Sequence, residues 1–388
     1  MKLSIRRVAA VGAGLILSLA LVTPVASATS ASATPTTSDT ATSAWDALLP
    51  DDWAARRDAA AARLGIGSNP ATEALKRVIN PGDYECGPTD LDAYIDGLLA
   101  GLTNAQVLFL FQSGVLDFPT YDALIFGRDT DPSYDLTIQS TKLHHTFRDV
   151  KRFWDIDSSD IQLHAMHGDM LLDTGRVSRL LQVLYGFTAA DADAYAAAVA
   201  NVIASVPAFD GGNNPIFTLN AFAFTGEGEP DPFIASIPDK LIFGDGIMDA
   251  LSFMGIADVG PRVVMGHEFG HHVQYEDNLF DSPLTGPEAT RRTELMADAF
   301  GTYFGVHARG LALNTKRVLD TEKTFYEVGD CAFNDPGHHG TPNQRMRTST
   351  WAADLANAAR PQGPILPSLT FAALFEAKLP ELVAPDAA

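Results

Sequence analysis

VMGHEFGHH, at residues 264–272, is the most informative stretch of the sequence. His267 and His271 are four residues apart, so on a helix they lie one turn apart on one face and both imidazoles can reach the same ion. Glu268 is rotated from His267 by about 100°, the angular step of an α-helix. Its carboxylate can therefore stand beside a metal without binding it, which is the arrangement that activates a metal-bound water.

A second motif supplies the third ligand that a catalytic zinc ion normally takes from a protein. TELMAD, at residues 293–298, places Glu294 and Asp298 on one face of the next predicted helix. We expect Glu294 to bind the metal and Asp298 to accept the free ring N–H of a ligating histidine, His267. Charged side chains are rarely buried without a partner, and these two lie in an otherwise apolar helix. A metal held between the two helices accounts for both of them.

A His-Glu-x-x-His pattern also arises by chance, on a surface helix with a stripe of histidines. The second motif, in register on the following helix, argues against that interpretation. His164 and His167 could bind another metal ion together with Asp169, although such a pair is more often structural.

Hydrophobic patterning predicts an α+β fold. The expected helices and strands are, in chain order, helices at 143–154, 177–185 and 189–206, strands at 215–224 and 240–243, and helices at 261–274 and 288–307. We expect a small mixed sheet packed on the helix that carries the histidines, followed by a mainly helical C-terminal lobe. The cleft is expected between the sheet and that lobe.

The N-terminus predicts an exported protein. Three cations precede an apolar run at 8–22, which is shorter than the roughly 20 residues that span a bilayer. Small-residue cleavage triplets follow at 26–28 and 31–33. We therefore expect a signal peptide at 1–28 and a flexible Ser/Thr/Ala linker at 29–44, with an uncleaved membrane anchor as the alternative.

The net charge of −21 restricts the partners of the protein. Nucleic acids and anionic membranes need clustered cations, so a chain this acidic is not expected to bind them. No second long apolar stretch follows the N-terminal one, so no stable membrane association is expected once the signal is removed.

The two cysteines, Cys86 and Cys331, admit two interpretations. In an exported protein an even pair favours a disulfide, which would tie the N-terminal region to the core. The alternative is that the mainly helical region 45–133 is a cleaved pro-region, whose Cys86 thiolate blocks a zinc ion.

Several stretches resemble the thermolysin-like zinc metallopeptidases, whose third ligand is a glutamate, and the bacterial neutral zinc metallopeptidase group. They are, in chain order, NAF at 220–222, FGDG at 243–246, the helix at 263–273, ELMADAFGTYF at 294–304 and HGTPNQR at 339–345. The resemblance implies a zincin-like fold and a metallopeptidase domain at 134–388. It also implies a zinc ion (Zn2+) held by His267, His271 and Glu294.

The same resemblance implies roles for other residues. Glu268 would be the general base, and the strand at 220–222 would hold the substrate by main-chain hydrogen bonds, with Asn220 and Ala221 as contacts. A late histidine or tyrosine would stabilise the oxyanion. His339 is the first candidate for that role, and the other candidates are His338, Tyr303 and Tyr326.

The sequence thus favours a secreted zinc-dependent endopeptidase that acts on peptides or proteins. One alternative is a zinc amidase acting on a non-peptide or cell-wall substrate. Another is a non-catalytic zinc-containing binding protein, against which the presence of Glu268 argues.

Overall fold

The computed structural model of the protein describes residues 48–64, 89–329, 338–359 and 363–384. Helices cover most of these residues: α2 (Trp53–Leu64), α4 (Asp90–Leu99), α5 (Asn104–Ser113), α6 (Phe118–Phe126), α7 (Ser140–Val150), α8 (Thr174–Tyr185), α9 (Ala189–Ser205), α10 (Asp245–Phe253), α11 (Gly260–Glu276), α12 (Pro287–Val306), α13 (Thr315–Glu327), α14 (Pro342–Ala358) and α15 (Ser368–Leu382). The predicted signal peptide, the predicted linker and both cysteines lie outside the described residues.

The strands form one small mixed sheet. They are β1 (Gln162–Met166), β2 (Ala221–Phe224) and β3 (Lys240–Gly244), in the order β1-β3-β2. β1 runs parallel to β3, with His164 opposite Ile242, and β2 runs antiparallel to β3, with Phe222 opposite Ile242. Every residue of β3 is buried, as expected for a central strand. β2 is therefore an edge strand, with one row of backbone groups facing away from the sheet.

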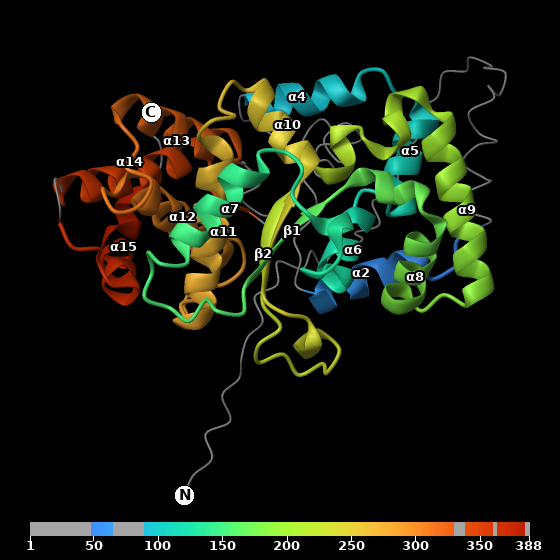
Figure 1. Cartoon of the computed structure of the whole chain (residues 1–388), viewed down its shortest axis with the longest axis horizontal. Coiled ribbons are helices and arrows are strands. Elements are labelled where there is room, and N and C mark those ends of the chain that lie inside the picture. Colours follow the sequence, from blue (N-terminus) through green and yellow to red (C-terminus); the bar gives the residue numbers. More distant parts are fainter. Residues whose placement is uncertain (1–47, 65–88, 330–337, 360–362, 385–388) are drawn as a thin grey trace, which may run out of the picture.

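Helices lie on both sides of this sheet (Figure 1). On one side are α7 and α11 to α15, and on the other are α2, α5, α6, α8 and α9. α11 contacts β2 and β3, whereas α6 contacts β1 and β3. The prediction of an α+β fold with a small mixed sheet and a mainly helical C-terminal part is thus confirmed.

α11 and α12 approach each other closely because glycines line their contact. A Cβ atom built on Gly301 of α12 would lie 2.7 Å from the backbone nitrogen of His267, and one on Gly266 would lie 3.0 Å from the Cα of Gly301. One turn along α11, a Cβ on Gly270 would lie 3.0 Å from the Cβ of Phe300. The bare glycine backbones let side chains from the two helices converge on one point.

The predicted strand at 215–224 is wrong in its first half. Pro215–Thr218 forms a 3₁₀ turn, and the side chain of Asn214 accepts a hydrogen bond from the backbone N–H of Ile216. Proline has a fixed φ that suits the first turn of a helix, which explains why the chain coils here. Only Ala221–Phe224 is extended and paired.

α6 is fastened to the sheet by a buried lysine. The Nζ atom of Lys240, on β3, donates to the backbone oxygens of Ala123, Leu124 and Gly127 at 3.3, 2.6 and 2.9 Å. The last carbonyls of a helix largely lack partners within the helix, so the N–H groups of an amine placed there can satisfy them. The N-terminal helices therefore contact the strand that leads to α10 and α11.

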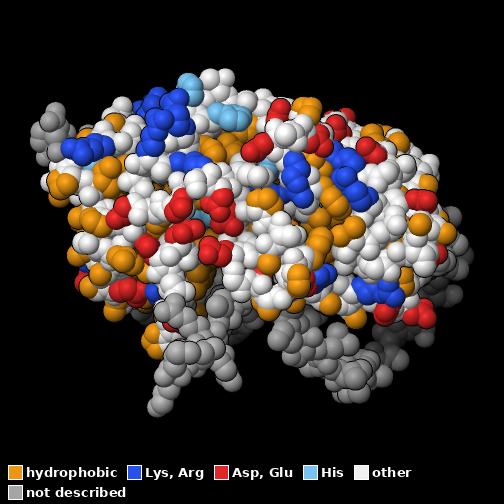
Figure 2. Space-filling model, turned by 60° about the horizontal axis from the view of Figure 1, so that its bottom comes forward, with side chains coloured by type: hydrophobic (Ala, Val, Ile, Leu, Met, Phe, Trp, Pro, Cys, Tyr) orange, Lys and Arg blue, Asp and Glu red, His pale blue; other side chains and the backbone are white. Residues whose placement is uncertain are grey.

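Within the described ranges, no single helix has both the length and the apolar composition to cross a membrane. Two sharply bent helix pairs meet those criteria only when each pair is taken together: Asp90–Leu99 with Asn104–Phe126, and Ala189–Ser205 with Pro207–Thr218. The surface seen in Figure 2 carries basic as well as acidic side chains, with apolar ones between them, despite the net charge of −21.

Candidate metal centre

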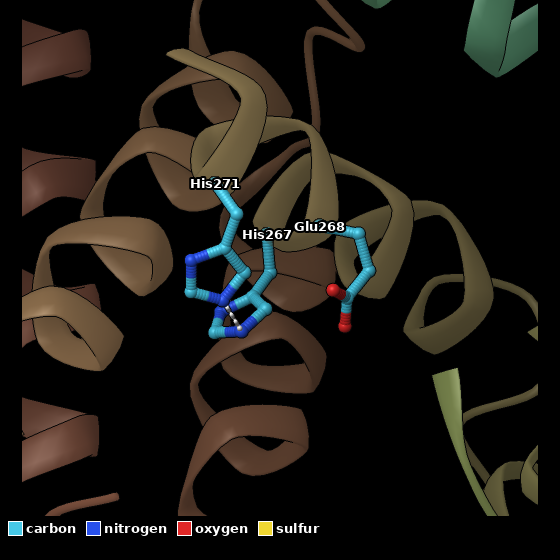
Figure 3. Close-up of side chains that lie close together, drawn as sticks. All are labelled: His267, Glu268 and His271. Carbon is cyan, nitrogen blue, oxygen red and sulfur yellow. Dashed lines mark hydrogen bonds between the residues drawn. The ribbon is translucent and has the colours of Figure 1, made fainter. Parts of the chain in front are cut away.

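His267 and His271 project from one face of α11 toward a common point (Figure 3). Their Nε2 atoms are 3.2 Å apart, and the planes of the two rings are nearly perpendicular. Both side chains are largely enclosed, with 9% and 13% of their surface exposed. Spacing on the helix thus brings the two imidazoles together, as the sequence indicated.

Glu294, on α12, faces the same point. Its Oε2 lies 3.5 Å from the Nε2 of His267, and its Oε1 lies 3.5 Å from the Nε2 of His271. With metal–ligand bonds of about 2.0–2.2 Å, the corners of a tetrahedral site lie roughly 3.3–3.6 Å apart. The two distances involve different oxygens of Glu294, and each matches the spacing between two ligands of such a site.

Glu268 stands beside the triangle of His267, His271 and Glu294. Its ligand atom lies within 4.8 Å of those of His267 and His271, so the three side chains form a buried group that could hold a metal ion. Burial raises the pKa of Glu268 to about 7, and the nearby backbone N–H of Ala223 in β2 opposes that rise. The carboxylate is therefore placed between the triangle and the edge strand.

Hydrogen bonds fix the orientation of both imidazoles. The Nδ1 of His267 lies 2.8 Å from the Oδ1 of Asp298, and the Nδ1 of His271 lies 2.9 Å from the Oε1 of Gln274. Both partners are acceptors, because the amide nitrogen of Gln274 donates to the backbone oxygen of Thr293 at 2.7 Å. Each ring therefore carries its proton on Nδ1 when neutral and turns the lone pair of Nε2 to the shared centre.

Charge is unevenly distributed among these side chains. Burial opposes protonation of His267, but hydrogen bonds with Asp298 and Glu294 raise its pKa to about 10. Burial lowers the pKa of His271 to about 4. Burial also opposes ionisation of Glu294, but the imidazoles of His271, His267 and His339 hold its pKa well below its usual range. A divalent cation would take the place of the proton on His267, since metal ligands must be deprotonated.

Known proteins offer no match to this chain: no family model, no curated protein and no solved structure matches it. What the chain does contain is a buried His-Glu-His group that could hold a metal ion, in a mostly helical α+β fold. Any assignment of function therefore rests on the chemistry of this group.

Two residues of the site were not anticipated. Gln274 lies three residues after His271 on the same helix, so its position could have been found from helical spacing. Arg345, on α14, donates two hydrogen bonds to Asp298, and no local pattern indicates that contact.

The other residues predicted for the site have varied positions. Asn220 precedes the edge strand β2, and its backbone oxygen accepts from the N–H of Gly244 at 2.9 Å. Ala221 is the first residue of β2. His339 is partly buried and close enough to Glu294 to help lower the pKa of its carboxyl group.

The remaining candidates for the oxyanion role differ from His339. His338 is almost fully buried. Tyr303 is fully buried, packs against Phe153 and Phe371, and accepts from the backbone N–H of Leu366, so it belongs to the aromatic core under α15. The side chain of Tyr326 lies outside the described residues.

His164 and His167 bind separate partners. The Nε2 of His164 lies 3.0 Å from the Oε1 of Gln162, and the Nδ1 of His167 lies 2.6 Å from the Oδ2 of Asp245. The Nε2 of His167 lies 3.0 Å from the backbone oxygen of Asp135, so both of its nitrogens are engaged. Hydrogen bonds within the fold account for these two histidines.

Proposed function

We propose that the protein is a secreted zinc-dependent endopeptidase that cleaves peptide bonds with a metal-activated water. The observation that carries the proposal is the buried group of His267, Glu268 and His271, with the carboxylate of Glu294 3.5 Å from both imidazoles. Three protein ligands and one open position are typical of catalytic zinc, whereas structural zinc is closed by four. The resemblance to thermolysin-like metallopeptidases in the motifs quoted above supports the same class of reaction.

Two neutral imidazoles and one carboxylate suit zinc among the common divalent ions. When bound, the ion would supply a Lewis acid and lower the pKa of a coordinated water. Asp298 and Gln274 would keep the two imidazoles turned toward the ion, because both acceptors hold the Nδ1 protons. The chain itself thus supplies ligands, orientation and a neighbouring proton acceptor.

Glu268 is proposed as the general base. It is 6% exposed, and burial raises its pKa to about 7, where a carboxylate both accepts and returns protons efficiently. It would take a proton from the water and later deliver it to the leaving amine. Glu294 differs in having a pKa held well below its usual range, which suits a permanently ionised ligand.

The edge of β2 is proposed to hold the substrate. Asn220 bonds to Gly244, so by antiparallel alternation the backbone groups of Ala221 and Ala223 face away from β3. The Ala223 N–H is close to Glu268, which places this outward row beside the proposed base. An extended peptide could add to the edge as a further strand, with Asn220 and Ala221 among its contacts.

Export of the protein is proposed from its N-terminal sequence. The cations and the apolar run before 26–28 predict a signal peptide. A disulfide between Cys86 and Cys331 fits the same extracellular setting, where thiols are oxidised. Mass spectrometry of the unreduced protein tests the disulfide, since two free thiols would contradict it.

The test of the enzymatic function compares the wild type with Glu268→Gln on casein and on a peptide library. We expect the substitution to lower the rate of cleavage by at least about 100-fold without removing the metal, because it removes only the proton acceptor. Glu276→Gln, at the exposed end of the same helix, is the matched control and should cleave normally. Metal analysis should find zinc in all three proteins.

Two outcomes would count against the peptidase. Equal cleavage by the wild type and Glu268→Gln would show that the activity does not belong to this site. Zinc-loaded wild type that leaves every peptide intact would favour the amidase or the binding protein instead.

A further inference from the structure

We infer that Arg345 is a positioning residue of the metal centre. It holds the carboxylate of Asp298 in the plane that directs His267 to the metal. Its positive charge also offsets one of the three buried carboxylates of the site. This inference rests on the proposed function and extends it to α14. The residue lies 47 positions beyond Asp298 in the chain, on a helix that packs against α12.

The contact between Arg345 and Asp298 is bidentate. The Nε of Arg345 donates to Oδ2 at 2.8 Å, and Nη2 donates to Oδ1 at 2.6 Å. The arginine side chain is 4% exposed and the aspartate side chain is fully buried. Paired hydrogen bonds between a guanidinium and a carboxylate fix both groups in one plane, which a lysine cannot do.

The same carboxylate also orients a proposed metal ligand. Oδ1 of Asp298 accepts from Nη2 of Arg345 and lies 2.8 Å from the Nδ1 of His267. Without the guanidinium, the carboxylate could rotate about its own bonds and carry the imidazole with it. Arg345 therefore acts on His267 through Asp298, without touching the metal position.

Charge gives Arg345 a second role. Glu268, Glu294 and Asp298 bring three carboxylates into an enclosed site, and a divalent ion supplies only two positive charges. The Nη2 of Arg345 lies 4.0 Å from the Oε2 of Glu294, so the positive charge of the guanidinium is close enough to balance the third negative charge. An uncompensated buried charge is strongly destabilising, so the arginine stabilises the enclosed site by offsetting the charge that a divalent ion would leave unbalanced.

Phe325 of α13 keeps the guanidinium in place. Its ring centroid lies 5.8 Å from that of His267 and 5.9 Å from the Cζ of Arg345, so it packs against both groups. The Nη1 of Arg345 also donates to the backbone oxygen of Val328 at 3.2 Å. The guanidinium is thus held by α12, α13 and the segment that follows α13.

The test measures the zinc affinity of the metal-free protein by competition with a chromophoric chelator. Arg345→Met should bind zinc about 10- to 100-fold more weakly than the wild type, as is typical when a partner behind a metal ligand is lost. Arg345→Lys keeps the charge but not the bidentate contact, so its affinity should fall between the two. Circular dichroism checks that each variant is folded.

Arg292→Met is the matched control. Arg292 is a similarly buried arginine on α12 that donates to Glu376 at 2.7 Å and to the backbone oxygen of Leu279 at 2.8 Å, and neither partner belongs to the site. It should keep the wild-type affinity for zinc. A loss in Arg292→Met as large as that in Arg345→Met would overturn the inference, because any buried arginine would then have the same effect.

The remaining outcomes are also decisive. Folded Arg345→Met that binds zinc as tightly as the wild type overturns the positioning role while leaving the proposed function intact. Where Arg345→Met does not fold, wild-type affinity in Arg345→Lys overturns it, since the bidentate contact is then unnecessary. A wild type that binds no zinc fails the proposed function itself, and the inference fails with it.

Discussion

Gln274 shows how much a single side chain can fix in this protein. It accepts from the imidazole of His271 through its oxygen and donates to the backbone of Thr293 through its nitrogen. It therefore links α11 to the start of the second motif while holding one proposed ligand. No charge is involved, so its contribution should be one of orientation alone.

Gln274→Ala tests that contribution. We expect zinc affinity to fall about 10-fold, because the His271 ring loses the acceptor that fixes its tautomer. Gln182→Ala on α8, where the amide bonds to Ser178, is the matched control and should keep the affinity. An unchanged affinity in Gln274→Ala, measured by chelator competition, would show that the imidazole is oriented by packing alone.

Lys240 gives a prediction on stability and pH. Burial lowers its pKa to about 7 from its ordinary 10.5, with Arg128 adding to the effect. Between those two values the unfolded chain holds a proton that the folded protein lacks, so the free energy of unfolding rises with pH. Relative to Lys240→Met, the metal-free wild type should gain about 1.4 kcal/mol per pH unit in that window. Urea unfolding from pH 6 to 10 measures this difference in the free energy of unfolding. If the difference does not change with pH, Lys240 has the ordinary pKa of a lysine.

At the scale of elements, the site depends on how closely α11 and α12 pack. Both helices are almost entirely buried, and glycines on each side allow their backbones to touch. The two proposed histidine ligands belong to one helix and Glu294 to the other. The distance between the helix axes therefore sets the size of the metal site.

Gly301→Ala should enlarge that distance. The added methyl would lie 2.7 Å from the nitrogen of His267, so α12 must shift, at a cost of about 1–3 kcal/mol that alanine's better helix propensity offsets only in part. Zinc affinity should fall together with stability. Gly305→Ala, one turn further, meets nothing closer than 3.5 Å and should be neutral or stabilising. Thermal unfolding and zinc titration of both variants decide between them, and equal behaviour would contradict the packing argument.

Local patterns in the sequence predicted the elements that carry the site. The helix predicted at 261–274 is Gly260–Glu276, and the one predicted at 288–307 is Pro287–Val306, because apolar spacing and Pro261 act over a few residues. β1 was missed, since QLHAM shows no clear alternation and its buried His164 looks polar. Arg345 could not be linked to Asp298, because the spacing of residues in the chain does not reveal which distant helices meet.

At the scale of the whole molecule, the N-terminal helices complete the core around the sheet. Phe118 and Leu124 of α6 are fully buried against the rest of the fold, and Lys240 bonds to three carbonyls at the end of that helix. Trp53 of α2 packs edge-on against Tyr185 of α8 with ring centroids 4.7 Å apart. These contacts bear on the idea that 45–133 is a removable pro-region.

A chain that starts at residue 134 should therefore fail to fold. Loss of α6 would expose the face of β1 and β3 that it covers and would leave the buried amine of Lys240 without its three acceptors, each a large penalty compared with a net stability of about 5–15 kcal/mol. Solubility, near-ultraviolet circular dichroism and zinc binding of 134–388, compared with 45–388, measure the effect. A soluble, zinc-binding 134–388 would show that the sheet needs no cover from α6. In that case 45–133 could be removed after folding, and Cys86 would again be a candidate for blocking the metal.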